Sequence, residues 1–216
     1  MRDASIVAAF DFDGTISTTD SLRVFVRSTV GTPRFVTGAL VASPWLVGAA
    51  LGLVDRGTAK AAFLRTTIGG RSRAQLEVDV RRFLQDRLPE LIRPEMLARV
   101  RQHRALGHRV VLVSASPGLY LRPWAASVGI ETVLSTELAF DANDRFDGAF
   151  AKPNCWGPEK VRRLDAWWKD MPPRVLFAYG DSRGDREMAE RADYAWIRGQ
   201  GKLMPLTDAD APQRMA

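Results

Sequence analysis

Five short runs of apolar and β-branched residues alternate with helical segments along this chain, and this alternation most restricts its fold. The runs are SIVAAF, RVVLVS, ETVLS, RVLFAYG and YAWI, beginning at residues 5, 109, 131, 174 and 194. Several of the intervening segments repeat apolar residues at helical spacing. Strands that alternate with helices form a parallel sheet covered by helices, because parallel neighbours need a crossover connection. We therefore expect an α/β fold built on a parallel sheet.

Two local signals add detail to this pattern. Pro94 and Gly107 bracket PEMLARVRQHRALG as one helix, since proline is favoured in the first helical turn and glycine just past the last. The segment STELAFDANDRFDGAFA, residues 135–151, alternates side chains around the turn-forming residues 141–144. This arrangement is typical of a β-hairpin.

Residues 15–93 interrupt the alternation, because they contain helical patterns but no second strand-like run. We expect them to form an all-helical cap inserted into a core made of residues 1–14 and 94–216. The chain is long enough for this division, since 216 residues of which 46% are hydrophobic can bury one full core and a modest insertion.

The expected cap contains FVTGALVASPWLVGAALGLV, residues 35–54, a run of 20 residues without a charge. Such a run is long enough to cross a bilayer as a helix. Pro44 interrupts it, however, and the core segments on both sides must stay in one compartment. We expect two short helices that break near Ser43 and Pro44, either buried in the cap or dipping into a membrane surface.

Cysteine content and the start of the chain indicate a compartment. The single cysteine, Cys155, excludes an internal disulfide and fits a reducing environment, and we expect it to be a packed thiol. The first apolar stretch is too short for a signal peptide. We expect a cytoplasmic protein, with peripheral contact at the inner membrane surface if residues 35–54 reach lipid.

The net charge of +6 is compatible with nucleic acid, an anionic membrane face or a phosphorylated small molecule as partner. The basic residues of RSRAQLEVDVRRFLQDR and RPEMLARVRQHR recur at helical spacing between apolar positions, which favours solvated helix faces over a nucleic-acid-binding stripe. We therefore expect no nucleic-acid partner. His103 and His108 lie among these arginines, and we expect both at the surface.

Two acids stand where the first strand-like run ends. In AFDFDGTIST, Asp11 and Asp13 lie one residue apart, and Gly14 lets the chain turn after them. In an open α/β sheet the carboxyl ends of the strands face the crevice in which ligands bind. Taken alone, the same stretch fits a turn with a helix cap at Thr15 equally well.

Other strand ends supply further polar groups. Ser114 ends one strand and offers its hydroxyl and the N–H groups that follow it, whereas Asp181 and Asp185 follow another strand in GDSRGD. Lys160 stands early in the helical segment GPEKVRRL. Acids suit a hard divalent cation, and lysine and serine suit a phosphate. Taken singly, Ser114 also fits a helix N-cap, Asp185 a first-turn acid and Lys160 a solvated lysine.

The motifs DFDGT, VSAS, the lysine of GPEK, and GDSRGD resemble, in this order, the four motifs of the haloacid dehalogenase (HAD) superfamily. The insertion after the first motif resembles the phosphoserine-phosphatase-like subclass IB. The resemblance implies a Rossmann-like parallel-sheet HAD core with an inserted all-helical, C1-type cap. It also implies Mg²⁺-dependent hydrolysis of a phosphomonoester through an aspartyl-phosphate intermediate.

The resemblance further implies a role for each matching residue. Asp11 would be the nucleophile, Asp13 the general acid and base, and Lys160 a catalytic cation. The implied phosphate-binding residues are Gly14, Ser114, Ala115 and Lys160. The implied Mg²⁺ ligands are Asp11, the backbone carbonyl of Asp13, and Asp181, and the residues that support them are Ser182 and Asp185.

The substrate is the least determined part of this interpretation. Phosphoserine phosphatases of the subclass carry a glutamate shortly after the first motif, where this chain has Asp20, and an asparagine before the last acid, where it has Gly184. The apolar run and NCWGPEK are more similar to membrane-associated members such as phosphatidylglycerophosphatase C. Arg56, Lys60 and Arg65 follow the run. An anionic headgroup is one expected partner for them, and a solvated helix face is the alternative for each.

Three classes of function therefore stay open. The first is hydrolysis of a lipid phosphate such as phosphatidylglycerophosphate. The second is hydrolysis of a small soluble phosphomonoester such as phosphoserine or histidinol phosphate, for which the apolar run need only be cap core. The third is a non-enzymatic nucleic-acid-binding protein, which requires the acidic motifs to be coincidental.

Overall fold

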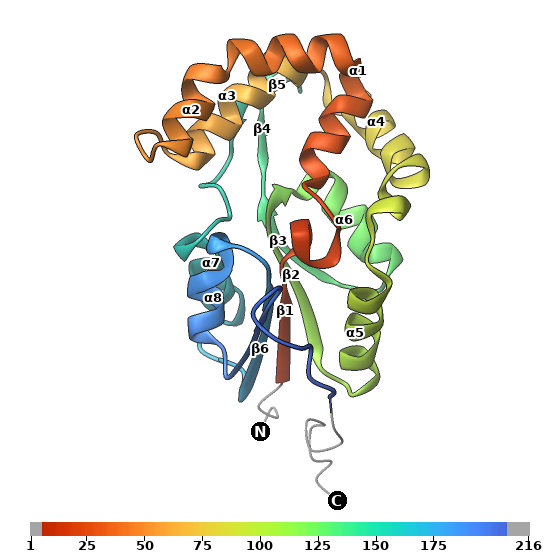
Figure 1. The fold of residues 1–216 in the computed structure, drawn as a ribbon. Coiled ribbons are helices and arrows are strands. Elements are labelled where there is room, and N and C mark those ends of the chain that lie inside the picture. The colour runs from red at the N-terminus through yellow and green to blue at the C-terminus, as the bar shows by residue number, and fades with distance from the viewer. Residues whose placement is uncertain (1–5, 207–216) are drawn as a thin grey trace, which may run out of the picture.

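The computed structural model describes residues 6–206 and contains a parallel sheet of five strands (Figure 1). Its strands are β1 (Ile6–Phe10), β2 (Arg109–Pro117), β3 (Thr132–Thr136), β6 (Val175–Gly180) and β7 (Tyr194–Ile197). Their order is β3-β2-β1-β6-β7, and each neighbouring pair is parallel. The predicted α/β class and parallel sheet are confirmed.

Strand β1 lies at the centre of the sheet, and all five of its residues are buried. Alternate side chains enter two different cores, as the period of an extended strand requires. Phe10 packs on the side of α5 (Pro94–Ala105) and α6 (Gly118–Ser127). Val7 and Ala9 pack on the side of α7 (Pro158–Trp168) and α8 (Arg186–Arg191). Burial on both faces explains why the run lacks polar residues until it ends.

The segment after β1 makes an irregular turn over Phe12–Ile16 and then forms helices above the carboxyl end of the sheet (Figure 1). These helices are α1 (Ser21–Val41), α2 (Ser43–Ala50), α3 (Arg56–Ile68) and α4 (Arg73–Asp86), followed by a 3-10 turn at Leu88–Leu91. Helix α1 is bent, because Gly31 has a φ of 75° and Pro33 follows it. The predicted break in the apolar run occurs at Ala42, one residue before Ser43, and Pro44 stands in the first turn of α2.

A β-hairpin from the second half of the chain belongs to the same layer as these helices. It consists of β4 (Leu138–Phe140) and β5 (Phe146–Phe150), which are antiparallel, as predicted. Gly70 N–H donates to the Phe146 carbonyl at 2.9 Å, and Phe146 N–H donates to the Arg71 carbonyl at 2.9 Å. The expected all-helical cap is therefore completed by a hairpin that lies within the range 94–216 assigned to the core.

The expectation that His103 and His108 lie at the surface is wrong. Their exposed fractions are 0% and 5%. Nε2 of His103 lies 2.7 Å from the Tyr179 hydroxyl. Nδ1 of His103 lies 2.7 Å from Nδ1 of His108. His103 continues the buried face of α5 that begins at Met96, seven residues earlier, so it points into the core although arginines flank it in sequence. Cys155 is buried, as predicted.

The apolar run does not form cap core along its length. Helix α2 contains no buried residue, and Leu40, Val47 and Leu51 are 66%, 56% and 68% exposed. Among residues 6–206, no helix combines the length and the hydropathy needed to cross a bilayer. The run is therefore buried only in part: Ala42 belongs to the core and Phe35 and Ala39 pack against it, whereas the side chains named above are exposed.

The histidine network predicts a measurable stability loss in Tyr179→Phe. The substitution keeps the ring that stacks on Phe10 at 4.3 Å but removes the hydroxyl that contacts His103. Because a buried polar atom loses a partner, we expect the free energy of unfolding to fall by about 1–3 kcal/mol in urea titrations. Tyr194→Phe is the matched control: its side chain is 57% exposed, and a loss above about 0.5 kcal/mol is not expected there. Equal stability of the two variants would contradict this role of the network.

Candidate active site

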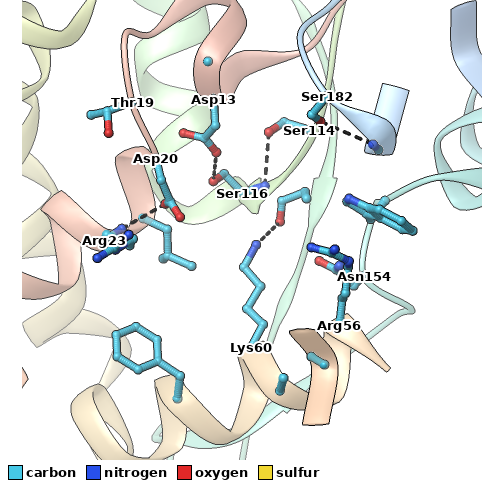
Figure 2. Close-up of a pocket in the computed structure, with 18 of the residues that line it drawn as sticks. Asp13, Thr19, Asp20, Arg23, Arg56, Lys60, Ser114, Ser116, Asn154 and Ser182 are labelled. Carbon is cyan, nitrogen blue, oxygen red and sulfur yellow. Dashed lines mark hydrogen bonds between the residues drawn. The ribbon is translucent and has the colours of Figure 1, made fainter. Parts of the chain in front are cut away.

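A cavity of about 870 Å³ lies between the carboxyl end of the sheet and the cap. Figure 2 shows polar side chains entering it from both sides, with Ser114 and Ser182 from the core and Arg56 and Lys60 from α3. Most residues predicted from the sequence line this one cavity. They are Asp11, Asp13, Gly14, Asp20, Arg56, Ser114, Ala115, Lys160, Asp181 and Ser182.

The floor of the cavity is an ion triad in which Lys160 lies between two carboxylates. Lys160 Nζ donates to Asp11 Oδ1 at 2.6 Å and to Asp185 Oδ1 at 2.5 Å. The three residues come from α7, the end of β1 and the turn before α8, and each is at least 94% buried. Lys160 is thus not a solvated helix lysine, and Asp185 is not an ordinary first-turn acid.

Burial and pairing shift the pKa values of this triad in different directions. Burial raises the pKa of Asp11 to about 8, although Lys160 acts against the shift. Burial alone would lower the pKa of Lys160, but the charges of Asp11 and Asp185 leave it above its ordinary value. Burial would raise the pKa of Asp185, but Lys160 and two backbone N–H donors bring it below its ordinary value. Lys160 and Asp185 thus favour each other's charged forms, whereas the charged form of Asp11 needs further compensation.

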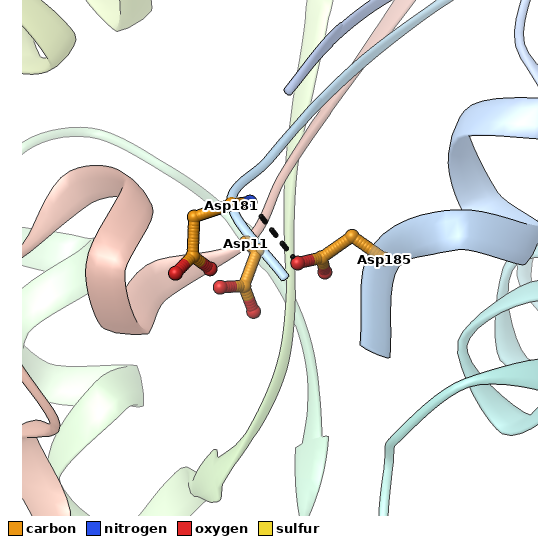
Figure 3. Close-up of side chains that lie close together, drawn as sticks. All are labelled: Asp11, Asp181 and Asp185. Atoms are coloured by element: carbon orange, nitrogen blue, oxygen red, sulfur yellow. Dashed lines mark hydrogen bonds between the residues drawn. The ribbon is translucent and has the colours of Figure 1, made fainter. Parts of the chain in front are cut away.

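Asp181 completes an acidic cluster with Asp11 and Asp185, shown in Figure 3. One carboxylate oxygen from each lies within 4.8 Å of the others. Asp181 Oδ1 is buried and has no hydrogen-bond partner among the described residues. The backbone of Gly14, with a φ of 77°, lies so close to the Asp181 carboxylate that a Cβ atom there would overlap it. This set of oxygen donors with one unpartnered oxygen fits a hard divalent cation such as Mg²⁺.

Asp13 reaches the cavity from the turn after β1 and is held by two donors. The Ser21 N–H donates to Oδ1 at 2.7 Å, and the Ser116 hydroxyl donates to Oδ2. The Ser114 hydroxyl in turn accepts from the Ser116 N–H at 3.1 Å. Burial raises the pKa of Asp13. The sequence analysis did not single out Ser116, although its place two residues after Ser114 was the available signal.

The cap contributes cations and one acid to the same cavity. Lys60 Nζ donates to the Ala115 carbonyl at 2.7 Å, which links α3 to the end of β2 (Figure 2). Asp20 caps α1 by accepting from the Arg23 N–H at 3.1 Å, and its carboxylate also lines the cavity. The structure does not bring Arg65 here: it lines a separate cavity, with its stem against Gly148. The reason is helical geometry, because nine residues place Arg65 about 180° around α3 from Arg56.

The structure explains why glycine stands at position 184. A Cβ atom there would overlap the indole ring of Trp156. The same indole has the Arg56 guanidinium 5.0 Å from its ring centre and that of Arg183 at 5.7 Å. A larger side chain at position 184 would therefore displace a tryptophan that contacts the cap across the mouth of the cavity. Trp156 lies in NCWGPEK, the segment noted above for its resemblance, but the sequence did not indicate its contacts with Gly184 and Arg56.

Comparisons with known proteins agree with this geometry. The profile of the haloacid dehalogenase-like hydrolase family matches residues 8–190. Protein CicA of Caulobacter vibrioides strain NA1000 / CB15N is 37% identical over 204 residues, covering 93% of this chain and 90% of that protein.

Solved structures share the fold at lower identity. A protein of unknown function from Bordetella pertussis Tohama I superimposes with a TM-score of 0.76 at 20% identity, covering 89% of both chains. A phospho-aspartyl intermediate analogue of phosphoserine phosphatase superimposes with a TM-score of 0.62 at 13% identity, covering 90% of this chain and 86% of that one.

The ion triad predicts that Lys160→Met destabilises the fold strongly, since two buried carboxylates lose their common counter-ion. We expect a loss of about 3–5 kcal/mol in urea unfolding. Adding Asp185→Asn should restore part of that loss, because it removes one uncompensated charge. Lys152→Met, at an exposed site, is the control and should change stability by less than about 0.5 kcal/mol. A double variant less stable than Lys160→Met would contradict the assigned pairing.

Proposed function

The chain belongs to the haloacid dehalogenase-like hydrolase family, and we propose that it is a phosphatase that hydrolyses a phosphomonoester through a phosphoryl group carried on Asp11. One observation carries the proposal: Lys160 holds Asp11 Oδ1, while Oδ2 accepts no hydrogen bond from any described residue, in a side chain that lines the cavity. A carboxylate fixed by one oxygen presents the other as a nucleophile.

The proposed first step is attack of Asp11 Oδ2 on phosphorus. A P–O bond forms to Asp11 as the bond to the leaving alcohol oxygen breaks. Asp13, which accepts hydrogen bonds from Ser21 and Ser116, would give that oxygen its proton. Water then attacks the phosphoryl group on Asp11, and Asp13 takes a proton back. The products are the alcohol and inorganic phosphate, and Asp11 returns to its starting state.

Other residues stabilise the negative charge that both steps concentrate at phosphorus. Lys160 lies beside the nucleophile, and the Ser114 hydroxyl with the backbone at Ala115 and Gly14 forms the wall that a phosphoryl group would contact. Asp11, the Asp13 carbonyl and Asp181 would hold Mg²⁺. When bound, this cation reduces the repulsion between an anionic nucleophile and an anionic phosphate.

The uneven lining of the cavity supports a proposal for the substrate class. Its floor is charged, but the cap side includes Phe35, Ala39, Leu46, Ala49 and Ala50. A phosphomonoester with an apolar body would contact that wall while its phosphate reaches Asp11, and we propose a lipid phosphate such as phosphatidylglycerophosphate. Arg56 and Lys60 would contact further negative charge on the headgroup. A small soluble phosphomonoester such as phosphoserine or histidinol phosphate is the competing substrate class.

The role of Asp11 predicts that Asp11→Asn loses turnover without losing the fold. Asparagine keeps the oxygen that accepts from Lys160 but removes the nucleophilic charge, so we expect kcat to fall by about 10⁴-fold or more. Asp20→Asn removes a carboxylate from the same cavity and preserves the helix cap, and kcat should stay within about tenfold. Steady-state phosphate release measures both variants. Turnover of Asp11→Asn near the wild-type rate would rule out the covalent route.

The apolar wall predicts a substrate-dependent effect of Leu46→Asn. With a short-chain lipid phosphate dispersed as monomers, we expect kcat/KM to fall by about tenfold, because this half-exposed side chain loses its contact with the acyl chain. With a small soluble phosphomonoester the change should stay below about threefold. Val78→Asn, on α4 away from the cavity, is the control. Equal losses on both substrates, or a wild-type preference for the small one, would contradict the lipid assignment.

A further inference from the structure

We propose that the exposed apolar side chains of α1, α2 and the turn after α2 form a docking surface for an anionic lipid bilayer. This surface, called here the apolar ridge, consists of Val36, Leu40, Val41, Trp45, Leu46, Val47, Leu51 and Leu53. In Figure 1 these elements form one edge of the cap, at the end of the molecule away from the sheet. This proposal rests on the proposed function, because docking on a bilayer would bring a lipid substrate close to the cavity.

Exposure of this kind is concentrated in the ridge. Among the described residues, twelve large hydrophobic side chains are exposed, and eight of them fall between positions 36 and 53. No charged residue interrupts positions 35–54, and no residue of α2 is buried. A contiguous apolar patch on a folded protein marks an interaction surface, because leaving it in water is unfavourable.

The charge around the ridge favours an anionic bilayer over another protein. Residues 21–68, which contain the ridge, carry six basic side chains and one acidic one; of the six, Arg23, Arg56 and Lys60 line the cavity and Arg65 lines a separate one. Arg34 stands just before the ridge, and Arg56 follows it at the start of α3, next to the one acid of this segment, Asp55. An apolar surface flanked by cations matches acyl chains bordered by anionic headgroups. Trp45, with a polar N–H on an apolar ring, suits the boundary between them.

The ridge is continuous with the wall of the cavity. On α1, Phe35 and Ala39 line the cavity, whereas the next residues, Val36 and Leu40, belong to the ridge. Leu46 of α2 belongs to both. The same two helices would therefore touch the bilayer with one face and the substrate with the other. A lipid leaving the bilayer would meet apolar side chains all the way to the cavity. A protein partner bound to the ridge would need no such apolar connection to the cavity.

The test is flotation of the full chain with two kinds of vesicle, phosphatidylcholine mixed with phosphatidylglycerol and phosphatidylcholine alone. We expect the wild type to float with the anionic vesicles, less so with neutral ones, and less at high salt. Val47→Asp and Leu51→Asp should each reduce the floating fraction by about tenfold, because a charge replaces an inserted side chain. Both positions are exposed and lie outside the cavity lining, so folding and turnover should persist.

Val78→Asp is the matched control, since Val78 is 45% exposed on α4 outside the ridge, and it should float like the wild type. Absence of flotation at low salt would overturn the proposal, and so would equal binding by Val47→Asp and Val78→Asp, which would indicate attraction by charge alone. Self-association of the wild type without vesicle binding, abolished by Val47→Asp in sedimentation, would assign the ridge to a second copy.

Turnover of a soluble phosphomonoester tests phosphatase activity without any membrane. If that turnover persists while vesicle binding is absent, the docking surface fails and the phosphatase activity stands. Vesicle binding without hydrolysis of a lipid phosphate would leave the docking surface standing and remove the lipid assignment. Hydrolysis of monomeric lipid phosphate without vesicle binding would do the reverse.

Discussion

The structure depends on one buried ammonium group between two buried carboxylates. Lys160 connects Asp11 at the end of the central strand to Asp185 in the turn before α8. All three side chains are buried, so water cannot compensate their charges and they must compensate one another. Burying charge is favourable only when partners compensate it. Two carboxylates around one lysine, with Asp181 beside them, leave an excess of negative charge at the cavity floor. That excess makes the site suited to a divalent cation.

The cap determines what can approach this floor. It places Lys60 against the end of β2, Arg56 against Trp156 and an apolar wall opposite the charged groups. Gly184, in the last acidic motif, leaves room for the indole of Trp156, and this indole contacts Arg56 of α3. Under the proposed function, phosphate chemistry belongs to the strand ends, and the inserted helices select the rest of the substrate.

Sequence analysis anticipated the parts of this arrangement that follow local rules. Apolar runs that end in Asp11, Ser114 and Asp181 predict a sheet edge, because parallel strands bring their carboxyl ends together. It failed where tertiary packing decides. His103 looks like part of a polar helix until α5 turns one face to the core, and Arg65 looks equivalent to Arg56 until α3 points it to the opposite side. The joining of the hairpin to α3 and the role of Trp156 depend on contacts between distant segments, which no local pattern encodes.

The central claim is that Asp11 carries the phosphoryl group, and trapping that group on the protein tests it most directly. Enzyme mixed with a radiolabelled phosphomonoester and Mg²⁺ is quenched in acid within a turnover, digested, and the labelled peptide is sequenced. The account predicts hydroxylamine-sensitive label on the peptide that contains Asp11, and none in Asp11→Asn. Rapid phosphate release with no protein-bound label at any quench time, or label on another residue, would contradict it.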